Sequence, residues 1–169
     1  MAKEIVDNIF NAETYEPITE LTINEIPYKA KGTFKFDMKA KQFAKKNDKG
    51  EVEGTGFHEI YNGLLNRNPE AIVQFWVCAI AHYKVQPSQE EIQEAVEKVI
   101  EEKEDTLQLL QGAVEVLNES GFFKQQTKMF WFQMNQAPKL VKKDEKEEAQ
   151  NALAYMKETY VTLTNKQPY

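Results

Sequence analysis

Cys78 and His82 come nearest, in residue type and spacing, to a catalytic pair in this sequence. They stand four positions apart, so on a helix they would share a face and could form a thiolate–imidazole pair. An apolar setting, however, raises the pKa of a thiol and makes it inert. The neighbours of the cysteine are Trp76, Val77, Ala79 and Ile80. We therefore predict a buried structural cysteine, with the histidine at the C-terminal end of its helix.

The other motifs that could carry chemistry are incomplete. His58-Glu59 lacks the second histidine of a zinc-protease motif, and Gly54-Thr55-Gly56 lacks the lysine and the preceding strand of a phosphate-binding loop. The paired carboxylates Glu90-Glu91 and Glu101-Glu102 lie in an acidic stretch that reads as a solvated helix face. We predict no catalytic residue, no metal ligand and no cofactor, and we keep an enzyme built on the thiol–imidazole pair as an alternative.

Composition narrows the class of protein further. One cysteine in 169 residues excludes an intramolecular disulfide and a zinc site with two or more thiolates, and it is typical of a reducing cytoplasm. The 21 Lys and Arg against 27 Asp and Glu give a net charge of -6, which disfavours a dedicated nucleic-acid binder. No stretch approaches the ~20 apolar residues of a membrane-spanning helix, and residues 1–8 lack the apolar region of a signal peptide. We expect a soluble cytoplasmic protein with a sizeable core and no membrane partner.

Hydrophobic periodicity predicts a mainly α protein, a helical bundle with a small N-terminal β-hairpin. Alternating residues on both sides of Asn24-Glu25 predict the hairpin, with its turn at these two residues. Ser88 and Glu91 form a capping box, Asp105 can cap the next helix, and Pro138 is expected to end a later one. Helical spacing predicts helices over residues 36–44, 57–65, 69–83, 88–100, 105–117, 122–136 and 149–160, with a polar loop at 47–56. Over residues 3–11 it predicts either a short amphipathic helix or an arm that docks elsewhere. The helix over 69–83 is apolar on nearly every face, which places it at the centre of the bundle.

A change in composition after residue 137 predicts two parts of unequal size. Residues 1–137 contain the hairpin and most of the helices. Residues 138–169 begin with a mixed-charge stretch, Lys139 to Glu148, and continue into an amphipathic pattern. We expect a main helical domain at 1–137 and a charged linker with a terminal helix at 138–169.

Charge is separated along the chain. Residues 28–49 hold eight Lys against two Asp, a net charge of +6, whereas residues 89–119 hold ten acids against two Lys, a net charge of -8. One interpretation is that both stretches are solvated helix faces. Another is that they are complementary faces that join copies of the chain head to tail. For the second reading the candidate residues are Lys39, Lys41, Lys45, Lys46, Glu94, Glu97 and Glu101. A third reading has the Lys29–Lys49 segment bind nucleic acid, with Phe34, Phe36 and Phe43 stacking on bases.

Residues 122–136 are densely aromatic. Phe130, Trp131 and Phe132 point in successive directions around a helix, so they cannot all face one core. Some of these side chains are then expected to contact something else, either the C-terminal helix or a partner.

The order and spacing of several motifs resemble a known family, the tail assembly chaperones of long-tailed phages that infect Gram-positive bacteria. The resemblance covers residues 20–135. It rests on Phe36-Asp37, Gly56-Phe57, Ile60-Tyr61-Asn62-Gly63-Leu64-Leu65, Asn68-Pro69-Glu70-Ala71-Ile72-Val73, Phe75-Trp76, Pro87-Ser88 with Glu91, and Gly121-Phe122-Phe123-Lys124.

The resemblance implies a helical, non-enzymatic assembly factor. Such a protein binds the tape measure protein, keeps its long hydrophobic helices from aggregating, and helps recruit the major tail protein during tube assembly. It acts in the cytoplasm of the infected or lysogenic host and is absent from the mature virion. The candidate client-binding residues are Phe122, Phe123, Phe130, Trp131 and Met134. Many members also have a longer form made by ribosomal frameshifting, for which the Lys142-Lys143 codons are a candidate site. A small DNA-associated regulator using Lys29–Lys49 is the alternative.

Overall fold

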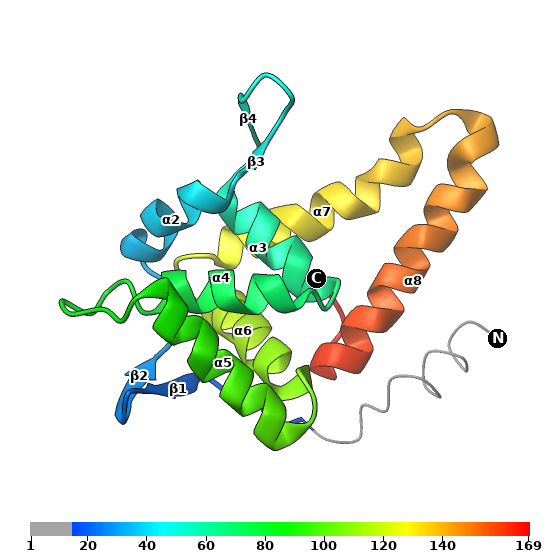
Figure 1. Ribbon diagram of the computed structural model, residues 1–169. Coiled ribbons are helices and arrows are strands. Elements are labelled where there is room, and N and C mark those ends of the chain that lie inside the picture. The colour runs from blue at the N-terminus through cyan, green and yellow to red at the C-terminus, as the bar shows by residue number, and fades with distance from the viewer. Residues whose placement is uncertain (1–14) are drawn as a thin grey trace. The chain divides into compact units, whose positions relative to one another are not determined.

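A computed structural model describes residues 15–169, and the helix or docking arm expected over residues 3–11 lies outside them (Figure 1). Contacts divide the described chain into two compact parts. Glu16–Phe123 is called the helical unit here, and Lys124–Tyr169 the C-terminal unit. Seven α-helices and two small antiparallel hairpins make up the described residues, which confirms the predicted mainly α fold with an N-terminal hairpin.

The helical unit opens with the predicted hairpin, formed by β1 (Glu20–Ile23) and β2 (Ile26–Lys29). The two strands are antiparallel, with Ile23 opposite Ile26. Asn24 and Glu25 make the turn with φ angles of 52° and 66°, the left-handed conformation that a two-residue hairpin turn requires at both positions. Leu21 on β1 is buried. The hairpin is therefore held by apolar contacts on one face, as an isolated two-stranded sheet requires.

The segment after the hairpin differs from the expected helix over 36–44. The helix α2 (Phe34–Ala40) is followed by the 3-10 turn η1 (Lys41–Phe43) and by a second hairpin, β3 (Lys45–Lys46) with β4 (Val52–Glu53). The Asn47 side-chain oxygen explains the difference, because it accepts hydrogen bonds from the Lys49 and Glu51 amides at 3.0 and 2.9 Å. The predicted polar loop is thus the tip of a hairpin, which extends away from the helices (Figure 1).

Four further helices complete the helical unit: α3 (Gly56–Leu65), α4 (Pro69–Ala79), α5 (Gln89–Lys103) and α6 (Leu107–Glu119). The predicted central helix is confirmed, since α4 contacts α2, α3, α5 and α6. The capping box is also confirmed: the Glu91 amide donates to Ser88 Oγ at 3.1 Å, and the Ser88 amide donates to Glu91 Oε1 at 3.0 Å. Asp105 lies one residue before Thr106, the N-cap residue of α6, and its carboxylate accepts a hydrogen bond from the Leu107 amide at 3.0 Å.

The central helix ends at Ala79, earlier than the predicted end at residue 83. The Ala79 carbonyl accepts a hydrogen bond from the Lys31 amide at 2.9 Å, so it is satisfied outside the helix. Tyr83, which lies outside the helix, contacts the first hairpin instead. Its hydroxyl accepts from the Lys29 amide at 2.9 Å, and its ring meets Tyr28 edge to face at 5.0 Å. The residues after α4 therefore fix the hairpin to the helices.

Aromatic side chains fill the core of the helical unit. The Phe123 ring lies 5.0 Å from that of Phe36 and 4.7 Å from that of Phe57. The hydroxyl of the buried Tyr61 donates to Asn118 Oδ1 at 2.8 Å, which pairs two polar groups inside the core. These contacts join α2, α3, α6 and the turn that follows α6.

The C-terminal unit is a helical hairpin of α7 (Lys124–Leu140) and α8 (Lys146–Thr164), joined by the 3-10 turn η2 (Lys143–Glu145). The Trp131 ring packs edge to face on Tyr160 at 4.9 Å. The prediction that Pro138 ends the helix was wrong, because α7 continues two residues past it. A proline so near the end of a helix removes only a terminal hydrogen bond. The boundary predicted after residue 137 falls inside α7, and the division of the chain into a main domain at 1–137 and a C-terminal part at 138–169 stays a prediction.

Candidate functional site

The structure does not bring Cys78 and His82 together as a catalytic pair. Cys78 is fully buried in α4, and this burial raises the pKa of its thiol to about 12, with a smaller opposing effect from Lys39. His82 lies beyond the end of α4, so the helical i, i+4 spacing is not realised. Partial burial, with a smaller contribution from Lys31, lowers the pKa of His82, and its Nδ1 atom has no hydrogen-bond partner among residues 15–169. The predicted burial of the cysteine is confirmed.

Two surface grooves flank helix α5, and both lie within the helical unit. The first, called the α4–α5 groove here, has a volume of about 360 Å³. Its apolar lining includes Phe43, Val73 and Ile100, each of which is half-buried. Its polar lining is mostly neutral, with glutamines at 74, 89 and 93 beside Glu70 and Glu97. An apolar floor between amide side chains suits the apolar face of a helix.

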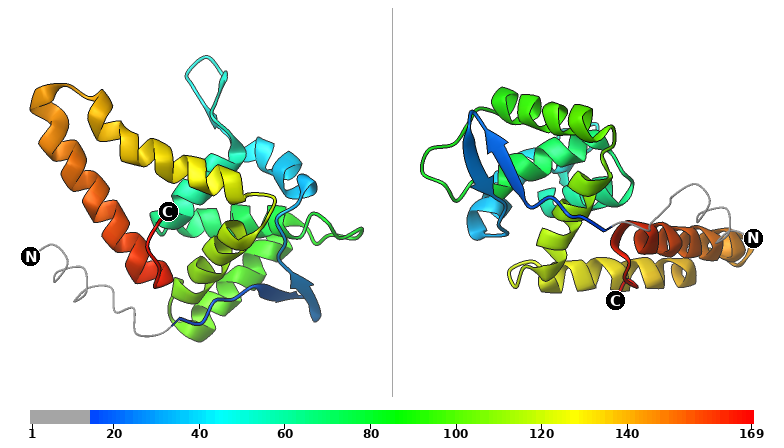
Figure 2. Two further views of the ribbon diagram at one scale, coloured as in Figure 1. Left: turned by 180° about the vertical axis from the view of Figure 1, so that it is seen from behind. Right: turned by 90° about the horizontal axis from the view of Figure 1, so that it is seen from below.

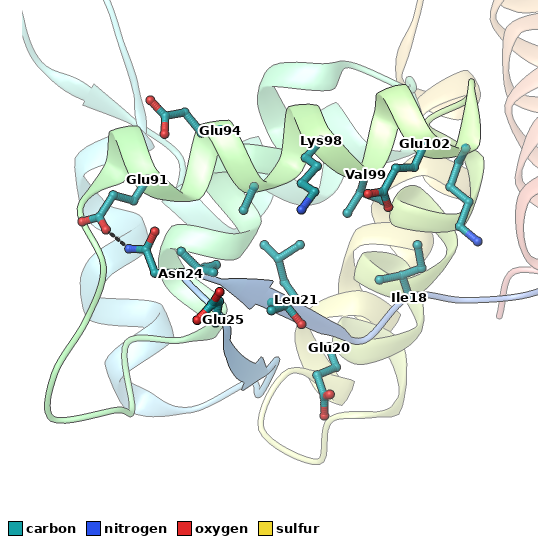
Figure 3. Close-up of a pocket in the computed structure, with 14 residues that line it drawn as sticks. Ile18, Glu20, Leu21, Asn24, Glu25, Glu91, Glu94, Lys98, Val99 and Glu102 are labelled. Atoms are coloured by element: carbon teal, nitrogen blue, oxygen red, sulfur yellow. Dashed lines mark hydrogen bonds between the residues drawn. The ribbon is translucent and has the colours of Figure 1, made fainter.

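The second groove lies between strand β1 and helix α5 and is called the β1–α5 groove here (Figure 3). Its volume is about 550 Å³. The half-buried residues Ile18, Ala95 and Val99 give it an apolar lining. Around them stand five glutamates and two lysines, so the lining carries a net charge of -3; these residues are Glu20, Glu25, Glu91, Glu94, Glu102, Lys98 and Lys103.

One of these glutamates is already engaged. Glu91 accepts a hydrogen bond from the Asn24 side chain, which ties the hairpin turn to the start of α5 (Figure 3). The hydrogen bond from the Ser88 amide and then that from Asn24 lower the pKa of the Glu91 carboxyl, so this group is ionised at neutral pH. The other four glutamates of the groove are exposed.

The predicted client-binding residues have unequal access to the surface. Phe123, Phe130 and Trp131 are buried, which removes them from any surface that a client contacts. Phe122 and Met134 are half-buried and keep this role as a prediction. The reason lies in the direction of neighbouring side chains on α7: Phe130 and Trp131 point inward, whereas Phe132 is exposed, as are Met129 and Leu140. The inference that Phe130, Trp131 and Phe132 cannot all face one core is confirmed.

The predicted self-association residues are all exposed, but they do not form two simple faces. The lysines are divided among three elements, with Lys39 on α2, Lys41 on η1, and Lys45 and Lys46 on β3. The acids are all on α5. Glu94 lines the β1–α5 groove and Glu97 lines the α4–α5 groove, on the other flank of the same helix.

The aromatic side chains that would support nucleic-acid binding are also divided. Phe34 is exposed, Phe36 is fully buried in the core, and Phe43 is half-buried in the α4–α5 groove. Base stacking needs several exposed rings along one face. The Lys29–Lys49 segment offers a single exposed ring, so the predicted stacking platform is not formed.

Sequence reasoning missed both grooves, although one signal for them was present. The apolar stripe of α5 is wide, with Ile92, Ala95, Val96, Val99 and Ile100. Only Ile92 and Val96 are buried, and the other three line the two grooves. This apolar stripe is wider than packing against one neighbouring helix requires. Such a stripe predicts that apolar side chains on both flanks of α5 stay partly exposed.

Within residues 15–169, no group of three or more His, Cys, Asp or Glu is placed to hold a metal ion, and no helix is long and apolar enough to cross a membrane. The described residues do form two grooves with apolar linings and separated charge, and both features suit binding surfaces.

Comparison with known proteins identifies a family. The family model described as "Phage tail assembly chaperone protein, TAC" matches residues 20–131, about two-thirds of the chain. The match covers the first hairpin, the α4–α5 groove, all of the β1–α5 groove except Ile18, and the first part of α7. No curated protein and no solved structure matches the chain. With a mainly helical fold and a family match over most of its length, this chain belongs to the phage tail assembly chaperone family.

Proposed function

We propose that the protein is a non-enzymatic chaperone that binds the tape measure protein, prevents its aggregation and promotes assembly of the tail tube with the major tail protein. It acts in the cytoplasm of the infected or lysogenic bacterial host and is absent from the finished virion. Membership of the tail assembly chaperone family supports the role in tail assembly. The observation that carries the client-binding part is the α4–α5 groove.

The chemistry of this groove suits an amphipathic helix as client. Burial of apolar surface provides the driving force, roughly 25 cal/mol for each Å² removed from water. Phe43, Val73 and Ile100 offer such surface between two fixed helices. The glutamine side chains of the lining both donate and accept hydrogen bonds, while Glu70 and Glu97 give the groove a net charge of -2 and favour basic residues beside the apolar stripe of the client. A groove of this kind would hold successive apolar stripes of a long helical protein.

A second exposed apolar surface stays available in the C-terminal unit. Met129 and Phe132 are exposed on α7, three positions apart on one helical face. Of the residues predicted for the client, Met134 lies on the same helix and Phe122 lies just before it. We assign the main client contact to the α4–α5 groove, because it is concave and lies within one compact unit.

Charge in the α4–α5 groove is expected to weaken client binding. Replacing Val73 and Ile100 with aspartate (Val73→Asp, Ile100→Asp) puts two carboxylates where apolar surface must be buried. We expect the affinity for a soluble amphipathic fragment of the tape measure protein to fall at least tenfold, since loss of each buried apolar side chain costs about 1.5 kcal/mol or more. Titration of the fluorescently labelled fragment measures this change.

The matched control is Val85→Asp, because Val85 is an exposed valine in the loop before α5. This variant should bind the fragment as the wild type does. Circular dichroism of all three proteins checks that the double variant is folded. Equal affinity of the folded double variant and the wild type would contradict the groove assignment.

Self-association belongs to the same proposal. A chaperone that covers a long client gains from contacts between neighbouring copies, because each bound copy raises the local concentration of the next. Opposite charges on one chain support head-to-tail contacts of this kind. The alternative, DNA association through Lys29–Lys49, predicts a mobility shift with duplex DNA that weakens steeply with salt. We expect no such shift.

A further inference from the structure

Helix α2 presents an apolar ridge to solvent. Phe34 and Met38, four positions apart on one helical face, are 76% and 67% exposed. The ring of Phe34 is supported from one side by Phe122, which it meets edge to face at 4.6 Å. Lysines 31, 35, 39 and 41 flank the ridge, and all four are exposed. Two large apolar side chains flanked by lysines therefore form a knob that is mostly exposed.

The β1–α5 groove has the complementary shape and charge. Its lining is apolar at Ile18, Ala95 and Val99, and its rim carries a net charge of -3 (Figure 3). A volume of about 550 Å³ is more than one phenylalanine and one methionine side chain occupy. Both surfaces belong to the helical unit, so each is built on a fixed scaffold.

The ridge cannot enter the groove of its own molecule. Helices α2 and α5 both pack against helix α4. Figure 2 shows α2 and α5 on different sides of the helical unit. A contact between these two surfaces must join two copies of the chain, and a pair joined in this way still has one free ridge and one free groove with which to continue or close the array.

We propose that the Phe34–Met38 ridge of one copy docks into the β1–α5 groove of the next copy. This proposal deepens the self-association part of the proposed function by naming both of its surfaces. Phe34 and Met38 bury their apolar surface in the groove. Lys35 and Lys39 then lie opposite Glu94 and Glu102 of the neighbouring copy. The contact is heterologous, so it repeats into a ring or an open helical array. The small area makes each contact weak, with dissociation constants expected in the micromolar range or above.

With this contact the two grooves bind different partners. The β1–α5 groove holds the neighbouring copy, and the α4–α5 groove on the other flank of α5 stays open for the client. Helix α5 would then link the copy-to-copy contact to the client contact. Of the acids predicted for self-association, this assigns Glu94 to the contact between copies and leaves Glu97 beside the client.

Charge reversal on each surface tests the proposal with full-length protein and without any client. One variant carries Lys35→Glu and Lys39→Glu on the ridge; the other carries Glu94→Lys and Glu102→Lys in the groove. Sedimentation velocity at 50 mM salt over a concentration series measures association. We expect wild-type protein to associate, each variant alone to associate at least tenfold more weakly, and an equimolar mixture of the two to regain wild-type association.

The rescue by mixing separates a specific contact from a simple change in net charge, because only the mixture restores opposite charges on facing surfaces. Replacing Phe34 with alanine should also weaken association, whereas Val52→Ala, at an exposed valine of the second hairpin, should leave it unchanged. Wild-type protein that stays monomeric throughout, or a mixture that fails to regain association, would overturn the proposal. Neither result alters the client titration with the α4–α5 variants, so the two proposals fail independently.

Discussion

Replacing Gly112 with alanine is expected to lower the free energy of unfolding by about 2 kcal/mol or more. Gly112 lies in α6, where the chain leading into β1 crosses the helix. A Cβ atom at this position would lie 1.7 Å from the carbonyl oxygen of Ile18, so the backbone itself must move. That backbone is held there, because the Ile18 amide donates to the Gln108 carbonyl at 3.0 Å.

Two opposing effects set the size of this loss. Alanine favours a helix interior over glycine by about 1 kcal/mol, which would stabilise α6. Overpacking against a fixed backbone costs ~1–3 kcal/mol or more, and here the loss of the Ile18 hydrogen bond adds to it. The clash dominates, since no side chain can rotate away to relieve it.

Urea denaturation followed by circular dichroism measures the loss, with Gly121→Ala as the control. Gly121 follows α6, and a Cβ atom there would meet nothing within 4 Å. We expect the control to unfold within about 0.5 kcal/mol of the wild type. If Gly112→Ala proves as stable as the wild type, then the segment before β1 does not pack against α6 as the structure has it.

The thiol of Cys78 is expected to react with a thiol reagent at least a hundredfold more slowly in the folded protein than in the unfolded chain, because it is both inaccessible and un-ionised. Burial raises its pKa from 9.0 to about 12, and the thiolate is the reactive form. At pH 8 a pKa of 9 leaves about a tenth of the groups ionised, whereas a pKa of 12 leaves about one in ten thousand. Because the folded pKa is the higher one, ionisation of this thiol destabilises the fold only as pH rises above 9.

Absorbance with a chromogenic disulfide reagent measures both rates, and the single cysteine makes the signal unambiguous. The rate in the folded protein should rise steeply between pH 8 and pH 10, unlike that of an activated catalytic thiol, which is already ionised below pH 8. A folded protein that reacts at pH 7 as fast as the unfolded chain would contradict the buried setting of Cys78 and favour the enzyme alternative.

Local signals in the sequence predicted much of the helical unit. The capping box at Ser88, the turn at Asn24-Glu25 and the all-round apolar character of α4 each depend on residues close together in the chain, and all three predictions are confirmed. Errors arose where a distant residue decided the outcome. The end of α4 at Ala79 depends on the Lys31 amide, more than forty positions earlier in the chain. No local pattern contains that contact.

The surfaces were harder to predict than the elements. Periodicity shows that Phe130, Trp131 and Phe132 point in different directions, but it does not show which of them is covered. The structure buries Trp131 against Tyr160 and leaves Phe132 exposed. The grooves on either side of α5 depend on how β1 and α4 pack against that helix, and this is a property of the tertiary structure.

The acidic and basic segments illustrate the same limit. The sequence shows the two opposite charges, and the structure confirms that their predicted residues are exposed. It also places Glu94 and Glu97 on opposite flanks of α5, in different grooves. Counting charges along the sequence therefore locates an acidic helix. Only the tertiary structure shows that the acidic residues of this helix are divided between two grooves.

The central claim is that this protein keeps the tape measure protein in solution by binding its amphipathic helices. The most direct measurement mixes the purified chain with a tape measure fragment that precipitates alone, followed by light scattering and size-exclusion chromatography. We predict that the fragment stays soluble and co-elutes with the chain in a complex larger than either protein. A fragment that precipitates at its usual rate, while the chain elutes at its own position, would contradict the claim.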